Sequence, residues 1–163
     1  MVGVQHYTAR EFKDMLGQQK FDNAFKFTFV RNPYDKVLSH YKFRVKTNQT
    51  NLGNNPFDFN QWIELTYGKK DPAFYDKPKF FMPQINWLTD QNDQVLVDFI
   101  GRFENLQQDF NIVCDYAGME RKTLPHLNKT KKTGSYRDFY NESSREIITE
   151  HFRKDLDYFG YEF

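Results

Sequence analysis

A predicted strand that passes directly into a helix, over residues 25–43, constrains the fold of this 163-residue chain more than any other stretch. In FKFTFVRNPYDKVLSHYKF, alternating phenylalanines predict a strand over residues 25–31, with Val30 on the opposite face. Asn32 is a good N-cap and Pro33 suits the first helical position, so a helix is expected to begin at Pro33. The turn between the two elements should therefore lie at the carboxyl end of the strand.

The predicted helix has an apolar stripe and a polar side. Its apolar residues fall together on a wheel of about 100° per residue and must face a core: Tyr34, Val37, Leu38, Tyr41 and Val45. Ser39 lies on the opposite side, together with Asp35 and Lys42. This arrangement turns the Ser39 hydroxyl away from the core.

The remaining periodic segments predict an α/β fold. A capping box at Thr8–Glu11 should start a short helix that stops at Gly17. A second strand is expected over 95–100, and further helices over 57–66, 104–116 and 143–157. Residues 68–84 are too irregular to assign. Strand, helix, strand, helix in this order favours a sandwich with parallel strands, in which ligands bind outside the carboxyl ends of the strands.

Charge does not indicate nucleic-acid binding, because 23 Lys and Arg residues are balanced by 22 Asp and Glu residues. A local excess is more informative. Residues 121–137 include six basic and no acidic residues. This stretch either holds a polyanionic ligand or is a solvated loop, and the residues leave both readings open.

The single cysteine, Cys114, excludes an intramolecular disulfide and a cysteine-based zinc site, and it is predicted to be a small core residue. No apolar run reaches the roughly 18 residues of a membrane span, and residues 1–20 lack a signal-peptide core. A soluble single domain is therefore expected.

The turn at residues 31–34 is a candidate anion site. A helix N-terminus offers backbone N–H groups and a partial positive charge. Arg31 adds a planar guanidinium suited to phosphate, and Ser39 can donate its hydroxyl to the same anion. Spacing alone leaves an alternative in which Arg31 pairs with a carboxylate and Ser39 is solvated.

FVRNPYDKVLSHY resembles the 3′-phosphate-binding motif of sulfotransferases that use 3′-phosphoadenosine 5′-phosphosulfate, in the branch that includes carbohydrate and heparan sulfate sulfotransferases. VDFIGRFENLQQDF, LPHLNKT and FRKDLDYFGYEF are similar to later blocks of that family, in the same order. The resemblance covers nearly the whole chain. It implies a P-loop NTPase-like three-layer sandwich with a mostly parallel sheet, as one sulfotransferase-like domain over residues 1–163.

The resemblance also implies roles for individual residues. Arg31 and Ser39 match the family's arginine and serine that grip the 3′-phosphate of the donor. HLNKT is similar to the loop that closes over the donor, which makes Lys129 and Thr130 candidate phosphate contacts. His6, in VQHYTAREF, resembles the catalytic base of the uronosyl 2-O-sulfotransferases, and imidazole chemistry suits proton removal near neutral pH. A structural role for His6 is the alternative, since other members of the family use a carboxylate as base.

The chain departs from the family's pattern at its start. The family carries an N-terminal strand and a loop that cradles the 5′-phosphosulfate, and nothing before His6 matches them. The resemblance therefore predicts an N-terminally truncated sulfotransferase. A P-loop kinase is less favoured, because neither a Walker lysine nor a magnesium-binding acid after a strand is evident.

The expected activity is transfer of a sulfuryl group from 3′-phosphoadenosine 5′-phosphosulfate to a hydroxyl of an oligo- or polysaccharide, with no metal. The alternative is a non-catalytic remnant that binds nucleotide or glycan without turnover. The expected location is the cytoplasm if the chain is bacterial, with a missing N-terminal membrane anchor left open.

Overall fold

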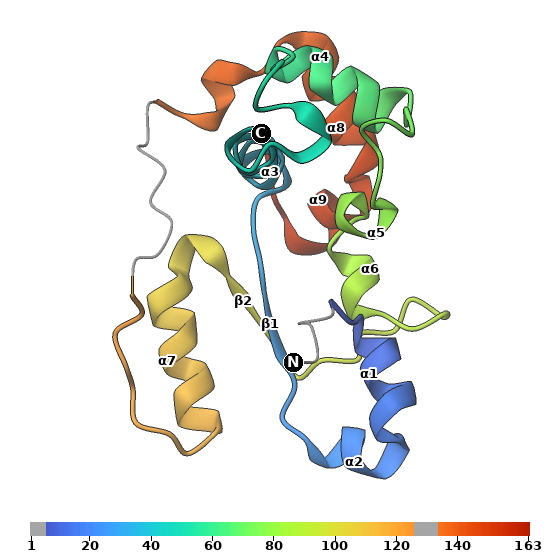
Figure 1. Cartoon of the computed structure of the whole chain (residues 1–163). Coiled ribbons are helices and arrows are strands. Elements are labelled where there is room, and N and C mark those ends of the chain that lie inside the picture. Colours follow the sequence, from blue (N-terminus) through green and yellow to red (C-terminus); the bar gives the residue numbers. More distant parts are fainter. Residues whose placement is uncertain (1–5, 126–133) are drawn as a thin grey trace. The chain divides into compact units, whose positions relative to one another are not determined.

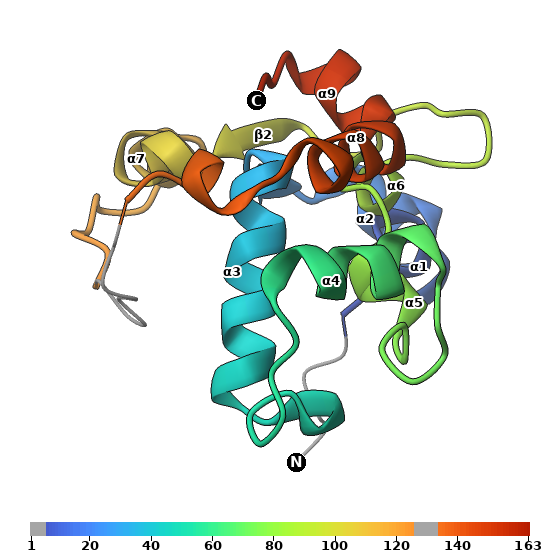
Figure 2. The same ribbon diagram turned by 90° about the horizontal axis from the view of Figure 1, so that it is seen from above.

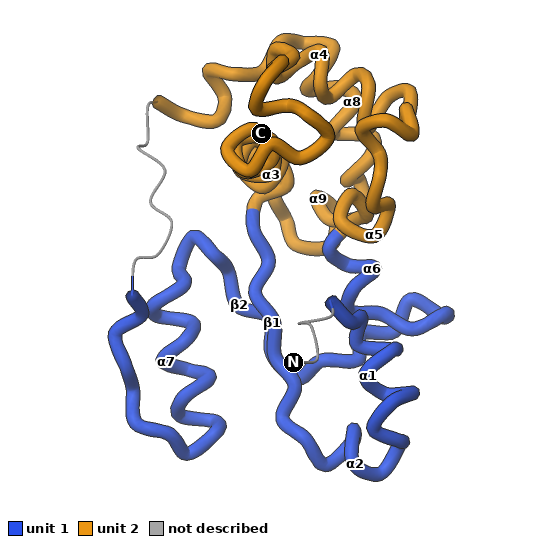
Figure 3. The backbone as a smooth tube through the Cα atoms, viewed as in Figure 1, with its two compact units in different colours: residues 1–31, 84–126 blue, residues 32–83, 127–163 orange. Residues whose placement is uncertain are grey.

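The computed structural model describes residues 6–125 and 134–163, and it has the expected α/β composition, with short helices and parallel strands (Figure 1). The chain divides into two compact units (Figure 3). Unit 1 contains residues 1–31 and 84–126, and unit 2 contains residues 32–83 and 127–163. The strand-to-helix turn at Arg31 and Asn32 is thus one of the points where the chain passes from one unit to the other. Whether both units fold as one domain stays a prediction.

Each unit has its own set of elements. Those of unit 1 are α1 (Ala9–Leu16), α2 (Gln18–Asn23), β1 (Phe27–Val30), α6 (Ile85–Leu88), β2 (Phe99–Arg102), η3 (Phe103–Asn105) and α7 (Leu106–Tyr116). Those of unit 2 are α3 (Pro33–Lys46), η1 (Gln49–Asn51), α4 (Phe59–Ile63), the π-helical η2 (Glu64–Gly68), α5 (Pro78–Phe81), η4 (Tyr136–Phe139), α8 (Glu142–His151) and α9 (Arg153–Phe159).

In unit 1, β1 and β2 pair in parallel, with Phe27 opposite Phe99 and Val30 opposite Arg102. The expected strand over 95–100 is misplaced, because β2 begins only at Phe99. Val95 instead forms an antiparallel bridge with Thr89, and the preceding loop folds back on itself. An apolar run satisfies either pairing, which is why its pattern alone placed the strand too early.

Gly101 of β2 is required by close packing in unit 1. A Cβ atom at this position would lie 2.6 Å from the ring of Phe29 and 3.1 Å from the Cβ of Asp109 on α7. The Asp109 carboxylate also accepts a hydrogen bond of 2.5 Å from the backbone N–H of Arg102. The glycine therefore lets α7 and β1 both approach β2 closely.

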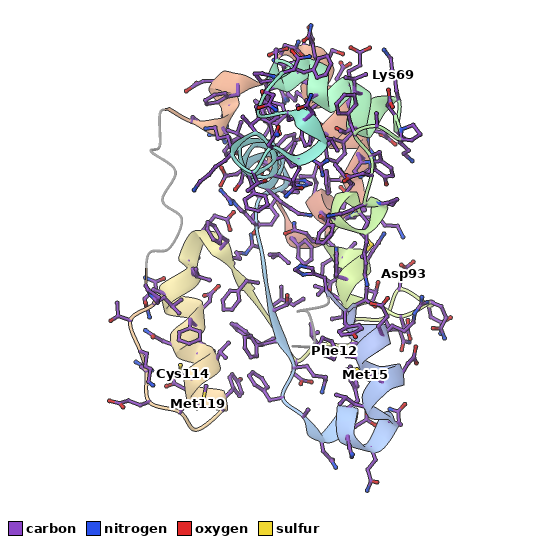
Figure 4. The ribbon with its side chains drawn as sticks, viewed as in Figure 1. Phe12, Met15, Lys69, Asp93, Cys114 and Met119 are labelled. Carbon is purple, nitrogen blue, oxygen red and sulfur yellow. The ribbon has the colours of Figure 1, made fainter. Side chains whose placement is uncertain are left out.

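The first helix and the cysteine follow the sequence expectations. Thr8 and Glu11 form the capping box of α1, and Gly17 ends that helix. Cys114 is buried on α7, whereas Phe12 and Met15 of α1 are largely exposed (Figure 4). Across the described residues, no helix is both long enough and apolar enough to cross a membrane.

In unit 2, α3 packs against α4 and α8 (Figure 2). The predicted stripe of α3 faces the core, with Tyr34, Val37 and Leu38 buried and Tyr41 and Val45 packed against them. The helix expected over 57–66 becomes α4 followed by a π-helical turn.

The last helix is broken where one continuous helix was expected. The chain changes direction at Phe152, which ends α8 and begins α9. Its ring is fully buried, as is the side chain of Ile148 one turn earlier. The two helices can therefore bury residues of both segments against one core.

A row of three basic residues, Lys36, His40 and Arg44, follows α3 at intervals of one helical turn. The Arg44 guanidinium is buried and pairs with Asp76 at 2.9 Å. The imidazole of His40 packs against the rings of Trp62 and Phe81. Burial, followed by the positive charges of Arg44 and Lys36, lowers the pKa of His40 from 6.5 to about 4. His40 is thus a half-buried residue whose imidazole is held in its neutral form.

Asn32 joins the strand-to-helix turn to the C-terminal segment of unit 2. Its side-chain oxygen caps α3 by accepting a hydrogen bond from the N–H of Tyr34 (3.0 Å). Its side-chain nitrogen donates to the hydroxyl of Tyr136 (3.3 Å) and to the backbone carbonyl of Glu162 (2.9 Å). The predicted N-cap is therefore confirmed, with a tether that the local sequence does not indicate.

We expect His40 to make unit 2 sensitive to acid. The unfolded chain takes up a proton near pH 6.5 and the folded chain only near pH 4, so stability is full above about pH 6.5 and falls between these values. The loss should be on the order of 2–3 kcal/mol. Urea denaturation from pH 7.5 to 4 should show a weaker pH dependence in His40→Gln. Parallel profiles for the two proteins would contradict the assignment.

We expect Asn32→Ala to lower the free energy of unfolding by about 1–2 kcal/mol, because both the helix cap and the tether are lost. Asn32→Asp keeps the cap acceptor but loses the donor, so it should fall between Asn32→Ala and wild type. Asn54→Ala is the control, since exposed Asn54 makes only a local bond to Asn51 (3.0 Å) and a bond to Asn48 from its backbone. Urea midpoints measure all three, and equal losses at positions 32 and 54 would refute the tether.

Candidate functional site

Arg31 lies directly after the last paired residue of β1, at the carboxyl end of the parallel strands, as predicted. Because Val30 is paired with Arg102, the next residues of the two strands, Arg31 and Phe103, leave the sheet at the same level. The Cζ atom of Arg31 lies 4.4 Å from the centroid of the Phe103 ring. The guanidinium thus rests on an aromatic surface, within cation–π distance.

The backbone of Arg31 is held by the side chain of Gln84, also in unit 1. The N–H of Arg31 donates to Oε1 of Gln84 at 3.0 Å, and Nε2 of Gln84 donates to the carbonyl of Arg31 at 2.8 Å. One amide group therefore satisfies both backbone groups of the residue, as a neighbouring strand would.

Few backbone donors remain at the start of α3, contrary to the expectation for this turn. Pro33 has no N–H, and the N–H of Tyr34 is used by the Asn32 side chain at 3.0 Å. An anion at this turn would therefore depend mainly on side chains, with Arg31 as the charged donor.

Ser39 lies on the second turn of α3, on the polar side that the wheel predicted, and is half-buried. On the same side, the Lys42 ammonium lies 4.4 Å from the centroid of the Phe139 ring. Arg31 belongs to unit 1 and Ser39 to unit 2, so each is placed within its own unit. Their joint grip on one phosphate stays a prediction.

His6 is exposed and lies just before the capping box of α1 in unit 1. The ring centroids of the next residue, Tyr7, and of Phe12 lie 5.3 Å apart, and this contact anchors the segment to the helix. Lys129 and Thr130 lie outside the described residues, as does His126. The part of the chain that is described contains no group of three or more His, Cys, Asp or Glu side chains that could hold a metal ion.

Gln84 and Phe103 are the two residues of this site that sequence reasoning missed. Gln84 ends a stretch without periodicity and lies 53 residues from its partner Arg31. Phe103 lies in GRFEN, between the predicted strand and the helix expected from residue 104, and it was given no role. Its place after the strand was the available signal, because parallel strands bring their carboxyl ends together.

Comparison with known proteins gives two matches. The sequence model of the Sulfotransferase family matches residues 2–162. An uncharacterized protein from Archaeoglobus fulgidus is 32% identical over 128 residues, which cover 77% of this chain and 92% of that protein. No solved structure matches significantly. Because the family match spans nearly every residue, the chain belongs to the sulfotransferase family.

Proposed function

We propose that this chain transfers a sulfuryl group from 3′-phosphoadenosine 5′-phosphosulfate to a hydroxyl of a carbohydrate, and that Arg31 and Ser39 bind the 3′-phosphate of the donor. Family membership supports sulfuryl transfer in general. The observation that carries the donor assignment is the placement of Arg31 at the carboxyl end of β1, with its backbone bracketed by Gln84.

A phosphate suits this position for physical reasons. The guanidinium donates two parallel hydrogen bonds to a pair of phosphate oxygens, and such charge-assisted bonds are stronger than neutral ones. Ser39 would add one neutral hydrogen bond from the second turn of α3. Lys129 and Thr130, in the segment that resembles the family's donor-covering loop, are proposed as further contacts to the donor.

The proposed reaction needs a base at the acceptor. The acceptor oxygen forms a bond to sulfur, the bond between sulfur and the 5′-phosphate oxygen breaks, and the acceptor proton must be taken up. We assign this proton to His6, which is exposed and belongs to the same unit as Arg31. The products are the sulfated sugar and adenosine 3′,5′-bisphosphate. No metal is required, since the transferred group carries less charge than a phosphoryl group.

We expect Arg31→Ala to weaken binding of adenosine 3′,5′-bisphosphate by about tenfold to a hundredfold, because a charge-assisted contact contributes about 1.5–3 kcal/mol. Ser39→Ala should weaken it by only about threefold to tenfold. Arg153→Ala is the control, since exposed Arg153 pairs with Glu150 (2.6 Å) on the surface. Isothermal titration calorimetry measures the affinity of wild type and of the three variants for the bisphosphate. Affinity unchanged in Arg31→Ala would exclude the phosphate contact.

We expect His6→Ala to lower kcat by about a hundredfold to ten-thousandfold while the affinity for adenosine 3′,5′-bisphosphate stays nearly constant. Transfer of labelled sulfate to a panel of uronic acid-containing and neutral glycans measures the rate. A His6→Ala protein with full activity would move the base elsewhere. Wild type that binds the bisphosphate but sulfates no glycan would support the non-catalytic alternative.

A further inference from the structure

We propose that Gln84 and Phe103 are positioning residues, which hold Arg31 in the orientation that binds the 3′-phosphate. This inference rests on the proposed function, because it concerns the same phosphate contact. It assigns roles to two residues of unit 1 that otherwise have none, and it predicts that donor recognition extends into the irregular segment before α6.

The Gln84 amide takes the place of a neighbouring strand. The carbonyl of Lys26, just before β1, accepts from the backbone N–H groups of Asp98 and Phe99, so every second residue counted from Lys26 turns its backbone groups toward β2. Arg31 has the opposite parity and turns its N–H and carbonyl toward the other edge. On that edge Gln84 supplies one acceptor and one donor, at 3.0 and 2.8 Å.

A fixed backbone matters because Arg31 follows the last paired residue of the sheet. The ladder with β2 ends at Val30 opposite Arg102, one residue before Arg31. An arginine side chain has many rotatable bonds, and ordering them on binding an anion costs free energy. The two hydrogen bonds with Gln84 fix the backbone from which the Arg31 side chain extends. Less conformational freedom is then lost when the side chain binds an anion.

The Phe103 ring constrains the other end of the side chain. The Arg31 Cζ atom lies 4.4 Å from the ring centroid, which places the guanidinium over the ring. The N–H donors of a guanidinium point outward within its plane, so an aromatic ring that contacts the group through its face would leave them able to bind a bidentate phosphate. Phe103 is 46% exposed, so the platform lies at the surface of unit 1, where a ligand can reach it.

Gln107 provides a matched control in the same unit. Its Nε2 donates to the carbonyl of Lys122 (3.0 Å), and its Oε1 accepts from the N–H of Leu124 (2.7 Å). A glutamine side chain at position 107 thus also pairs with one backbone carbonyl and one backbone N–H. Gln84→Met and Gln107→Met each remove a pair of bonds to backbone groups, and only the first pair concerns Arg31. Gln107→Met also removes a bond from Nε2 to Oδ1 of Asn111 (2.9 Å), so it is the more severe change of the two.

The test measures two ligands for each variant of the full chain by calorimetry: adenosine 3′,5′-bisphosphate and adenosine 5′-monophosphate, which lacks the 3′-phosphate. The dissociation constant of the monophosphate divided by that of the bisphosphate isolates recognition of the 3′-phosphate. We expect Gln84→Met to reduce this ratio by about tenfold and Phe103→Leu by about threefold. Gln107→Met should leave it unchanged. In an Arg31→Ala background, Gln84→Met should have no further effect on the ratio.

The outcomes separate this inference from the proposed function. A wild-type ratio near one, or a ratio that Arg31→Ala does not reduce, would refute the 3′-phosphate contact itself. A large wild-type ratio that depends on Arg31 but survives Gln84→Met would overturn the positioning role alone. If Gln84→Met weakened the binding of both ligands equally, the role of Gln84 would be merely structural, and the positioning role would be overturned as well. If Gln84→Met does not fold, Phe103→Leu decides, and an unchanged ratio there overturns the inference.

Discussion

The parallel pairing of β1 and β2 runs from Phe27 opposite Phe99 to Val30 opposite Arg102, and the candidate site depends on where it ends. This register requires a glycine at position 101, because a Cβ atom there would lie 2.6 Å from the Phe29 ring. A slip along the ladder would place a side chain in that gap and would separate the first residues beyond the two strands. The contact between the Arg31 guanidinium and the Phe103 ring is therefore a consequence of the register.

Asn32 serves the turn in two ways that compete with anion binding by the backbone. By capping α3, it uses the N–H of Tyr34, which the helix N-terminus would otherwise offer to a ligand. Its tether to Glu162 and Tyr136 fixes the turn within unit 2. A well-capped turn is thus a stable support, and the anion of the proposed function would depend there mainly on the side chain of Arg31.

Sequence patterns predicted the features that depend on neighbouring residues. The start of α3 and its buried stripe follow from capping and from helical spacing, and both are confirmed. The extent of β2 was wrong because Val95 satisfies a bridge as well as a ladder. Gln84 escaped prediction because its contact with Arg31 spans 53 residues and has no local periodicity. The roles of Arg31 and Ser39 came from the family resemblance, since spacing alone also allowed a carboxylate partner.

The row of basic residues on α3, Lys36, His40 and Arg44, gives the helix that carries Ser39 a second packed side. Arg44 is anchored at one end by Asp76, and the Lys36 ammonium lies 5.2 Å from the centroid of the Phe152 ring. A protonated His40 between them would add a third positive charge to a partly buried row, so desolvation and repulsion together keep its imidazole neutral at physiological pH. The helix can then pack on both its apolar stripe and this row, so the backbone of α3, which carries Ser39, is supported on two sides.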